Sequence, residues 1–177
     1  MRHVPVLLDE VLESLQLKSG MNIVDCTLGD GGHSEEILKV TAPSGRLLGI
    51  DTDPESLLRA KQNLYDFQNR VLFIRDNFVN LKKIVETEKF SNINGIVIDL
   101  GWSSPQFEDR GRGFTFQKDE PLDMRLSGDS GDTASNILND ESEEELVRIF
   151  NDYGEEKLSK QIAEAIIDFR KEEKIKM

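Results

Sequence analysis

The sequence predicts an α/β protein whose core is a doubly wound parallel sheet with right-handed crossovers. Two observations lead to this prediction. Short apolar runs alternate with segments of helical periodicity up to Leu100. Each run is also apolar on both of its faces, as a strand must be when helices cover both sides of a parallel sheet.

The elements of this sheet follow one another in a regular order. An amphipathic helix is expected over residues 5–17, because Pro5 suits a first helical turn and apolar residues then recur at helical spacing. Asp53 before Pro54 is typical of a helix beginning. We expect strands at residues 21–26, 46–51, 71–76 and 95–100, and further helices at about residues 34–40, 54–64 and 78–89. These elements form an incomplete Rossmann-like sheet, and its fourth strand has an uncovered apolar edge.

The pattern changes after Leu100. Residues 101–132 have no clear period and contain many glycines and aromatic side chains, which is typical of a functional or disordered segment. Helical patterns return at residues 134–138, 143–151 and 155–171, and Ser142 with Glu145 forms a capping-box sequence. We therefore divide the chain into residues 1–105, the Rossmann-like part, and residues 106–177, a loop with a C-terminal helical insertion segment.

Composition places the chain in a broad class. Cys26 is the single cysteine, so an internal disulfide is excluded and no Cys/His zinc spacing exists. No apolar stretch approaches the roughly 20 residues that a membrane helix needs, and the first residues show no signal-peptide cleavage pattern. We expect a soluble, cytoplasmic protein that contacts no membrane, with an organelle matrix as the alternative.

The charge of the chain argues against one class of partner. The formal net charge is -12 and the acidic residues are spread along the whole sequence. Proteins that bind nucleic acid tightly usually carry a basic face, which releases counterions from the phosphates. Taken alone, the composition therefore does not favour a protein that binds RNA or DNA.

A glycine-rich loop, "CTLGDGGHS" at residues 26–34, follows the first predicted strand. A dinucleotide fingerprint requires G-x-G-x-x-G at this place, and here Gly29 and Gly31 match while Ser34 replaces the third glycine. Glycines let the backbone approach a ligand closely, and the start of the next helix attracts a carboxylate as well as a phosphate. A plain turn is the alternative that remains open.

Acidic residues lie at the end of every predicted strand. The carboxyl ends of parallel strands form the edge at which such folds bind ligands. Asp51 lies where a ribose-binding acid belongs, so we expect an adenosine-type cofactor, and the missing third glycine favours S-adenosylmethionine over NAD. The acids at this edge are Asp25, Asp51, Asp76 and Asp99.

A second polar segment, "DLGWSSPQF" at residues 99–107, follows the fourth strand. Ser104 precedes Pro105 and is therefore held extended, so the segment should form a polar lip beside the same edge. Methylation of an exocyclic amine needs acceptors that draw the nitrogen lone pair out of conjugation with the ring, and Asp99 and Gln106 offer such atoms. The aromatic side chains nearby either stack on an extruded base or pack locally; they are Trp102, Phe107, Phe114 and Phe116.

Several motifs occur together and in order along the chain. They are "HVPVLLDEVLESL", "CTLGDGGHS", "GIDTDPES", "DNF", "GIVIDLGWSSPQFEDRGRGFTF", "PLDMR" and "NDYGEEKLSKQIAEAI". With them the chain, from His3 to about Lys171, resembles the MraW/RsmH family of S-adenosylmethionine-dependent methyltransferases. The resemblance implies a class I methyltransferase fold, S-adenosyl-L-methionine as cofactor, and methylation of the N4 amine of one cytidine in small-subunit ribosomal RNA, so that the RNA or the small ribosomal subunit is the partner.

The resemblance also implies roles for individual residues. Residues 31–33 contact the methionine end of the cofactor, Asp51 binds the ribose hydroxyls, and Phe78 lies against the adenine ring. Asp99 and Gln106 lie near the methyl group, and we assign Asp99 as the catalytic acceptor for the target amine, with no need for a metal ion. The cofactor-binding set is thus Gly31, Gly32, His33, Asp51, Phe78, Asp99 and Gln106.

Three positions depart from the family pattern, which usually has small residues or glycine in place of Cys26 and Asp30 and an aliphatic residue in place of Trp102. Cys26 is expected to be an inert thiol at a strand end. Asp30 adds negative charge beside a loop that would bind a carboxylate, so we expect it to weaken cofactor affinity.

The largest departure is length, because family members continue into further strands that complete the sheet and into a basic C-terminal segment. We therefore expect a fragment or a truncated relative. A non-catalytic module that binds the cofactor or the ribosome is the alternative function, and an NAD oxidoreductase is a weaker one. The uncovered strand edge also leaves open a homodimer.

Overall fold

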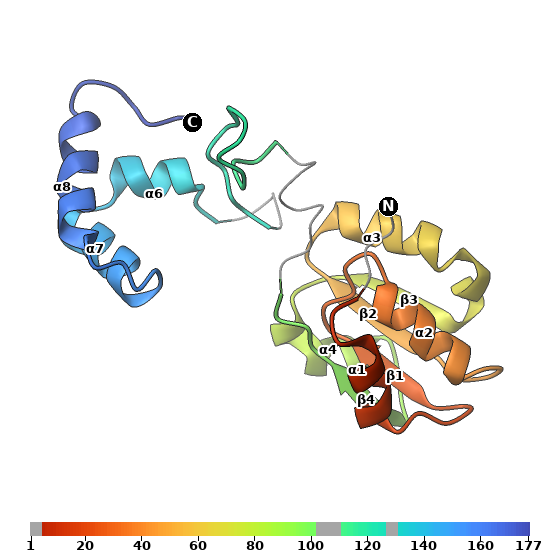
Figure 1. Ribbon diagram of the computed structural model, residues 1–177. Coiled ribbons are helices and arrows are strands. Elements are labelled where there is room, and N and C mark those ends of the chain that lie inside the picture. The colour runs from red at the N-terminus through yellow and green to blue at the C-terminus, as the bar shows by residue number, and fades with distance from the viewer. Residues whose placement is uncertain (1–4, 102–110, 127–130) are drawn as a thin grey trace. The chain divides into compact units, whose positions relative to one another are not determined.

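The computed structural model describes residues 5–101, 111–126 and 131–177 (Figure 1). The chain forms two compact units, Met1–Ser103 and Ser104–Met177. The break between them lies two residues before the division that we expected from the sequence. Each unit is described by itself below.

The first unit is built on a parallel sheet of four strands in the order β3-β2-β1-β4. The strands are β1 (Asn22–Asp25), β2 (Leu47–Asp51), β3 (Val71–Arg75) and β4 (Ile93–Val97). In the central register Val24 lies beside Leu48 on one side and Ile96 on the other. The predicted α/β class is confirmed, and the strand order is that of the first part of a Rossmann sheet.

Helices cover both faces of this sheet, as a doubly wound fold requires (Figure 1). Because successive side chains of a strand point to opposite faces, Ile23 packs in one core and Val24 in the other. The first core also holds side chains of α1 (Leu8–Leu15), α2 (Gly32–Val40) and α3 (Pro54–Asn63), and the second holds Ile84 of α4 (Leu81–Thr87). Two short 3-10 turns, η1 (Tyr65–Arg70) and η2 (Phe78–Asn80), precede β3 and α4.

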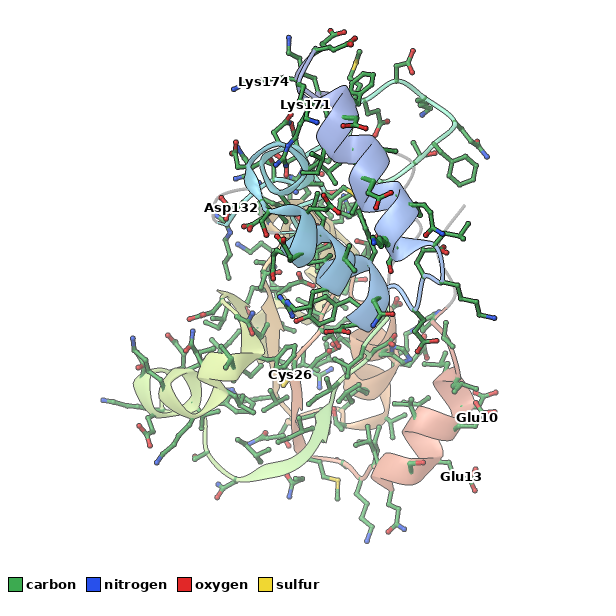
Figure 2. All side chains as sticks on the ribbon, turned by 90° about the vertical axis from the view of Figure 1, so that its left-hand side faces the viewer. Glu10, Glu13, Cys26, Asp132, Lys171 and Lys174 are labelled. Carbon is green, nitrogen blue, oxygen red and sulfur yellow. The ribbon has the colours of Figure 1, made fainter. Side chains whose placement is uncertain are left out.

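Most charged side chains of the first unit are exposed and its core is apolar, as the sequence pattern predicts. Figure 2 shows Glu10 and Glu13 projecting from α1 and Cys26 within the first unit. Both glutamates are exposed, whereas the Cys26 side chain is buried. Within the described ranges, no helix is both long and apolar enough to cross a membrane.

The expected boundary of the fourth strand is wrong. We predicted residues 95–100, but β4 is Ile93–Val97. Its partner β1 is short and ends at Asp25, which lies beside Val97, so the ladder ends there. Ile98 and Leu100 follow outside the sheet, and Leu100 is 81% exposed. Asp99 is therefore part of a loop.

The outer edge of β4 has no further strand among the residues that the structure describes. Ile96, the fourth of the five residues of this strand, is 46% exposed. An apolar edge of this kind is a template for pairing unless something covers it. Among the described residues of this unit, the outer edge of β4 is therefore without a paired strand, as the sequence predicted.

The second unit contains α6 (Ala134–Asp140), α7 (Glu143–Asp152) and α8 (Ser159–Phe169). Leu146 of α7 and Ala163 of α8 are fully buried. α8 begins four residues later than the expected Glu155, which has a positive φ of 50° and therefore lies outside a helix.

Side-chain caps begin two of these helices. The Ser142 hydroxyl accepts a hydrogen bond from the Glu145 amide at 3.2 Å, so the predicted cap is present. The reciprocal capping box, however, occurs at Thr133 and Asn136, where each side chain bonds to the main chain of the other. After α8 the chain returns to α6, where Ile175 exchanges hydrogen bonds with the Asn139 amide group at 2.8 and 3.0 Å.

Candidate functional site

The loops that follow the strands converge at one edge of the sheet, because all four strands are parallel. Asp25 and Asp51 are the last residues of β1 and β2. Asp76 directly follows β3, and Asp99 lies two residues beyond β4. The structure therefore brings the four predicted acids to the same edge, but their hydrogen bonds give each a different role.

Asp25 is the buried member of this group. Its carboxylate accepts a hydrogen bond from the Ser34 hydroxyl at 2.6 Å and another from the Thr27 amide at 3.1 Å. Burial raises the pKa of Asp25, and the two hydrogen bonds oppose this shift. Because Thr27 begins the glycine-rich loop and Ser34 lies in the first turn of α2, Asp25 connects the two ends of the loop.

The loop between β1 and α2 is tightly packed. Gly31 has a φ of 84°, and a Cβ there would lie 3.0 Å from Leu64. A Cβ at Gly32 would lie 2.5 Å from the Pro5 ring. Gly32 also begins α2, and the amides of a first helical turn have no acceptor within the helix, so they are available to an anionic ligand.

The His33 side chain is engaged by the chain itself. Its Nε2 lies 3.0 Å from the carbonyl oxygen of Val6, and since a carbonyl can only accept, the nitrogen donates. The ring thus holds the N-terminal segment against the start of α2. Its Nε2 is therefore engaged within the chain, and the main-chain amide of His33 lies in the first turn of α2.

Asp51 connects the first loop to the second. Its carboxylate accepts hydrogen bonds from the Gly29 amide at 2.8 Å and from the Asp53 amide at 2.9 Å. Asp53 is the predicted N-cap of α3, which is confirmed: it is buried and accepts from the Glu55 amide at 3.1 Å and the Ser56 hydroxyl at 2.9 Å. The two acids therefore have different roles. Asp53 is a buried helix cap, whereas Asp51 is partly exposed at the edge and accessible to a ligand.

The third loop presents an aromatic side chain. Hydrogen bonds from the Asn80 side chain and the Asn77 amide, both 2.7 Å long, lower the pKa of Asp76. Asn77 in turn accepts from the Val79 amide at 2.9 Å. These bonds fix a short turn in which Phe78 is 39% exposed, so its ring is accessible.

The fourth loop is joined to the first. The Asp99 amide donates a hydrogen bond to the Thr27 hydroxyl at 2.7 Å. Gln106 and the aromatic Trp102 and Phe107 lie outside the described residues. Of the predicted set, the structure therefore places residues 31–33, Asp51, Phe78 and Asp99 along one edge.

One interaction at this edge was not predicted from the sequence. The Arg59 Nε donates to the Asp30 carboxylate at 2.8 Å, and the Asn63 side chain donates to the Asp30 carbonyl oxygen at 2.9 Å. Asp30 is thus paired with a cation, although we had treated it as an uncompensated charge. No local sequence pattern indicated this pairing, because Arg59 and Asn63 lie on α3, 29 and 33 positions after Asp30.

Cys26 follows β1 at the same edge, and its thiol is buried. Burial, together with the charge of Asp25, raises the pKa of Cys26 to about 11. The thiol is therefore protonated near neutral pH and is a poor nucleophile. Across the three described ranges, no group of His, Cys, Asp and Glu side chains is arranged to hold a metal ion.

The fold and the edge define the class of protein. A glycine-rich loop after the first strand, a helix N-terminus beside it and an acid at the end of the second strand form the ligand-binding edge of a Rossmann-like protein. The entire sequence, residues 1–177, matches the profile of the MraW methylase family. The chain therefore belongs to the MraW methylase family.

Curated relatives agree with this assignment. A ribosomal RNA small subunit methyltransferase H of Clostridium botulinum (strain Loch Maree / Type A3) is 45% identical over 174 residues, which are 98% of this chain and 56% of that protein. One of the same name from Desulfosudis oleivorans is 42% identical over 170 residues, 96% of this chain and 54% of that protein. The chain thus spans about half the length of these relatives. Among solved structures, fibrillarin from Aeropyrum pernix with natively bound S-adenosyl-L-methionine aligns with a TM-score of 0.43 and 17% identity, over 50% of this chain and 36% of that one.

Proposed function

We propose that this chain is the cofactor-binding part of an S-adenosylmethionine-dependent RNA methyltransferase that acts on the N4 amine of a cytidine in small-subunit ribosomal RNA. Family membership and the names of the curated relatives support the reaction class and the RNA. The observation that carries the proposal is the hydrogen bond from the Gly29 amide to Asp51, which joins the two loops that would hold the two ends of the cofactor.

The residues at the edge fit S-adenosylmethionine. The main-chain amides of Gly32 and His33, which lie in the first turn of α2, would bind the carboxylate of the methionine end. Asp51, partly exposed, accepts hydrogen bonds from the ribose hydroxyls, and the accessible ring of Phe78 stacks on the adenine. When bound there, the cofactor supplies a methyl group on a positively charged sulfur.

The chain contributes position and hydrogen bonds to the transfer. The Asp99 carboxylate accepts a hydrogen bond from the target amine, which keeps the nitrogen lone pair out of conjugation with the ring. The Thr27 hydroxyl holds the Asp99 main chain at 2.7 Å and so fixes this acceptor beside the first loop. Orientation of the amine toward the methyl group supplies most of the rate enhancement.

The test is a methyl-transfer assay with this chain, radiolabelled S-adenosylmethionine and small ribosomal subunits that lack the modification. We expect label at one cytidine, and no label on subunits that already carry the methyl group. Asp99→Asn should lower the transfer rate. Label at other nucleotides, or a rate that Asp99→Asn leaves unchanged, would contradict the assignment.

A non-catalytic module is the second candidate function, and one observation favours it. The chain carries a net charge of -12, and an acidic composition does not favour tight binding to RNA phosphates. Cofactor binding without any transfer in the assay above would support this candidate.

Three further statements belong to the same proposal. We infer that residues 1–105 bind the cofactor and that residues 106–177 face the RNA. We place the activity in the cytoplasm, where small ribosomal subunits are its substrate.

The open apolar edge of β4 also supports a homodimer. Sedimentation of the purified chain tests that last inference, since a monomer at all concentrations would contradict it.

A further inference from the structure

A closed circuit of hydrogen bonds surrounds the glycine-rich loop. On one side, the Gly29 amide donates to Asp51 at 2.8 Å, and the Asp53 amide donates to the same carboxylate at 2.9 Å. The Ser56 hydroxyl then donates to Asp53 at 2.9 Å. These bonds lead from the loop after β1, through the end of β2, into the first turn of α3.

Arg59 closes the circuit. Its Nη2 donates to the Ser56 hydroxyl at 3.3 Å, and its Nε donates to the Asp30 carboxylate at 2.8 Å. Asp30 directly follows Gly29, where the circuit began. The Asn63 side chain adds a bond to the Asp30 carbonyl oxygen at 2.9 Å, so α3 holds both the side chain and the main chain of this loop residue.

The loop needs such support because of its composition. Gly29 and Gly31, on either side of Asp30, both have a positive φ, of 53° and 84°. Glycine populates many backbone conformations in a flexible loop, so the loop loses conformational entropy when a bound ligand fixes one of them. Contacts that hold the bound conformation in advance reduce this loss and raise affinity.

We propose that Arg59 is a positioning residue for the cofactor site, acting through Asp30 and Ser56. It holds the loop so that the amides of Gly32 and His33 and the carboxylate of Asp51 are aligned before the ligand arrives. This inference rests on the proposed function of the same edge. It also reverses the expectation from the sequence, because Asp30 then strengthens cofactor binding.

The sign of the effect of Asp30 separates the two interpretations. If its charge repels the methionine carboxylate, Asp30→Asn tightens the binding of S-adenosylmethionine. If Asp30 anchors the loop to Arg59, the same change weakens binding. The pair is partly exposed, with 31% of the Arg59 and 24% of the Asp30 side chain accessible, so we expect a moderate effect.

The experiment is a calorimetric titration of the chain with S-adenosylmethionine and, separately, with S-adenosylhomocysteine. Arg59→Ala should raise both dissociation constants about tenfold, the size expected for lost hydrogen bonds to a charged group. Arg59→Lys should recover part of the loss, since it keeps the charge near Asp30. The double variant Arg59→Ala/Asp30→Asn should bind no more weakly than the weaker single variant, because both remove the same contact.

A matched control is available on the neighbouring helix. Lys39, in the last turn of α2, forms ion pairs with Glu35 at 2.9 Å and Glu36 at 2.7 Å. Lys39→Ala should leave both dissociation constants unchanged. In amide correlation spectra of the unliganded proteins, Arg59→Ala should shift the Gly29 and Asp30 signals, and Lys39→Ala should not.

Each outcome decides a different question. If the unchanged chain does not bind S-adenosylmethionine, the proposed function fails. If it binds and Arg59→Ala binds equally well, or Asp30→Asn binds more tightly, the proposed function stands and the role of Arg59 is refuted. If Arg59→Ala loses its thermal transition, the milder Asp30→Asn and Arg59→Lys variants still give the sign of the effect.

Discussion

The carboxylate of Asp51 accepts a hydrogen bond from the Gly29 amide at 2.8 Å, although 22 positions separate the two residues in the sequence. This bond joins the end of β2 to the loop that follows β1. In the proposed site, Asp51 binds the ribose and the loop binds the methionine end of the cofactor. A substitution at either position should therefore weaken the binding of both the ribose and the methionine end of the ligand.

Replacement of Asp51 is the most direct perturbation of this contact. Asp51→Asn replaces the carboxylate that accepts hydrogen bonds from the Gly29 amide and, in the proposed site, from the ribose hydroxyls. We expect the dissociation constant for S-adenosylmethionine to rise about 10- to 100-fold in calorimetric titration, the range expected for hydrogen bonds to a charged group. Asp66→Asn, at an exposed position of η1, is the control and should bind normally. Equal affinity of the two variants would argue against a role for Asp51.

Gly31 should not tolerate a side chain. Gly31→Ala forces alanine into a left-handed conformation, which costs about 1–2 kcal/mol, and it also places a Cβ 3.0 Å from Leu64. Gly131 offers a matched control, because its φ is 83° and nothing lies within 4 Å of a Cβ there. In denaturant unfolding, Gly31→Ala should lower the free energy of unfolding more than Gly131→Ala. Equal losses would show that Leu64 accommodates the methyl group.

The buried Asp25 makes stability depend on pH. Burial raises its pKa in the folded chain above the ordinary value of 3.8, so at pH values between the unfolded and the folded pKa the folded state holds a proton that the unfolded state has released. The contribution of Asp25 is therefore most favourable below pH 3.8 and declines as the pH rises through the folded pKa. Asp25→Asn should remove this decline.

The measurement is the free energy of unfolding of both proteins at several pH values. The stability of the unchanged chain relative to Asp25→Asn should fall with rising pH across this window. A difference that stays constant with pH would contradict the raised pKa of Asp25.

The second unit should respond to pH in the opposite direction. Arg125 donates to both oxygens of Asp123, at 2.8 and 2.7 Å, and these hydrogen bonds lower the pKa of Asp123 to about 2. The stability that the pair contributes is present above the ordinary pKa and is lost as the pH falls toward 2. Asp123→Asn should cost about 1 kcal/mol at neutral pH, as for partly exposed ion pairs. Asp132→Asn, at an exposed acid, is the control for thermal unfolding, and a similar loss in both would refute the role of the pair.

Local sequence patterns were sufficient to predict much of the fold. The first three strands lie within the predicted ranges because apolar runs bounded by turn residues define them locally. The start of α3 was predicted for the same reason, since Asp53 and Pro54 are adjacent in the sequence. The end of β4 could not be predicted in this way, because the length of its partner β1 determines where the hydrogen-bonded ladder ends.

The contacts that shape the candidate site depend on the folded chain. The acids at the strand ends could be predicted, because a parallel sheet always brings its carboxyl ends together. The pairing of Asp30 with Arg59 could not, since it depends on how closely α3 packs beside a loop 29 positions earlier. The bond between His33 and Val6 likewise requires the N-terminal segment to lie on α2.

The most direct test of the account is calorimetric titration of the unchanged chain with S-adenosylmethionine. We predict saturable binding of one molecule per chain, lost or weakened in Asp51→Asn and preserved in Asp66→Asn. Absence of any heat of binding at about millimolar ligand, the weak end of the affinity scale, would contradict the assignment of this edge as a cofactor site.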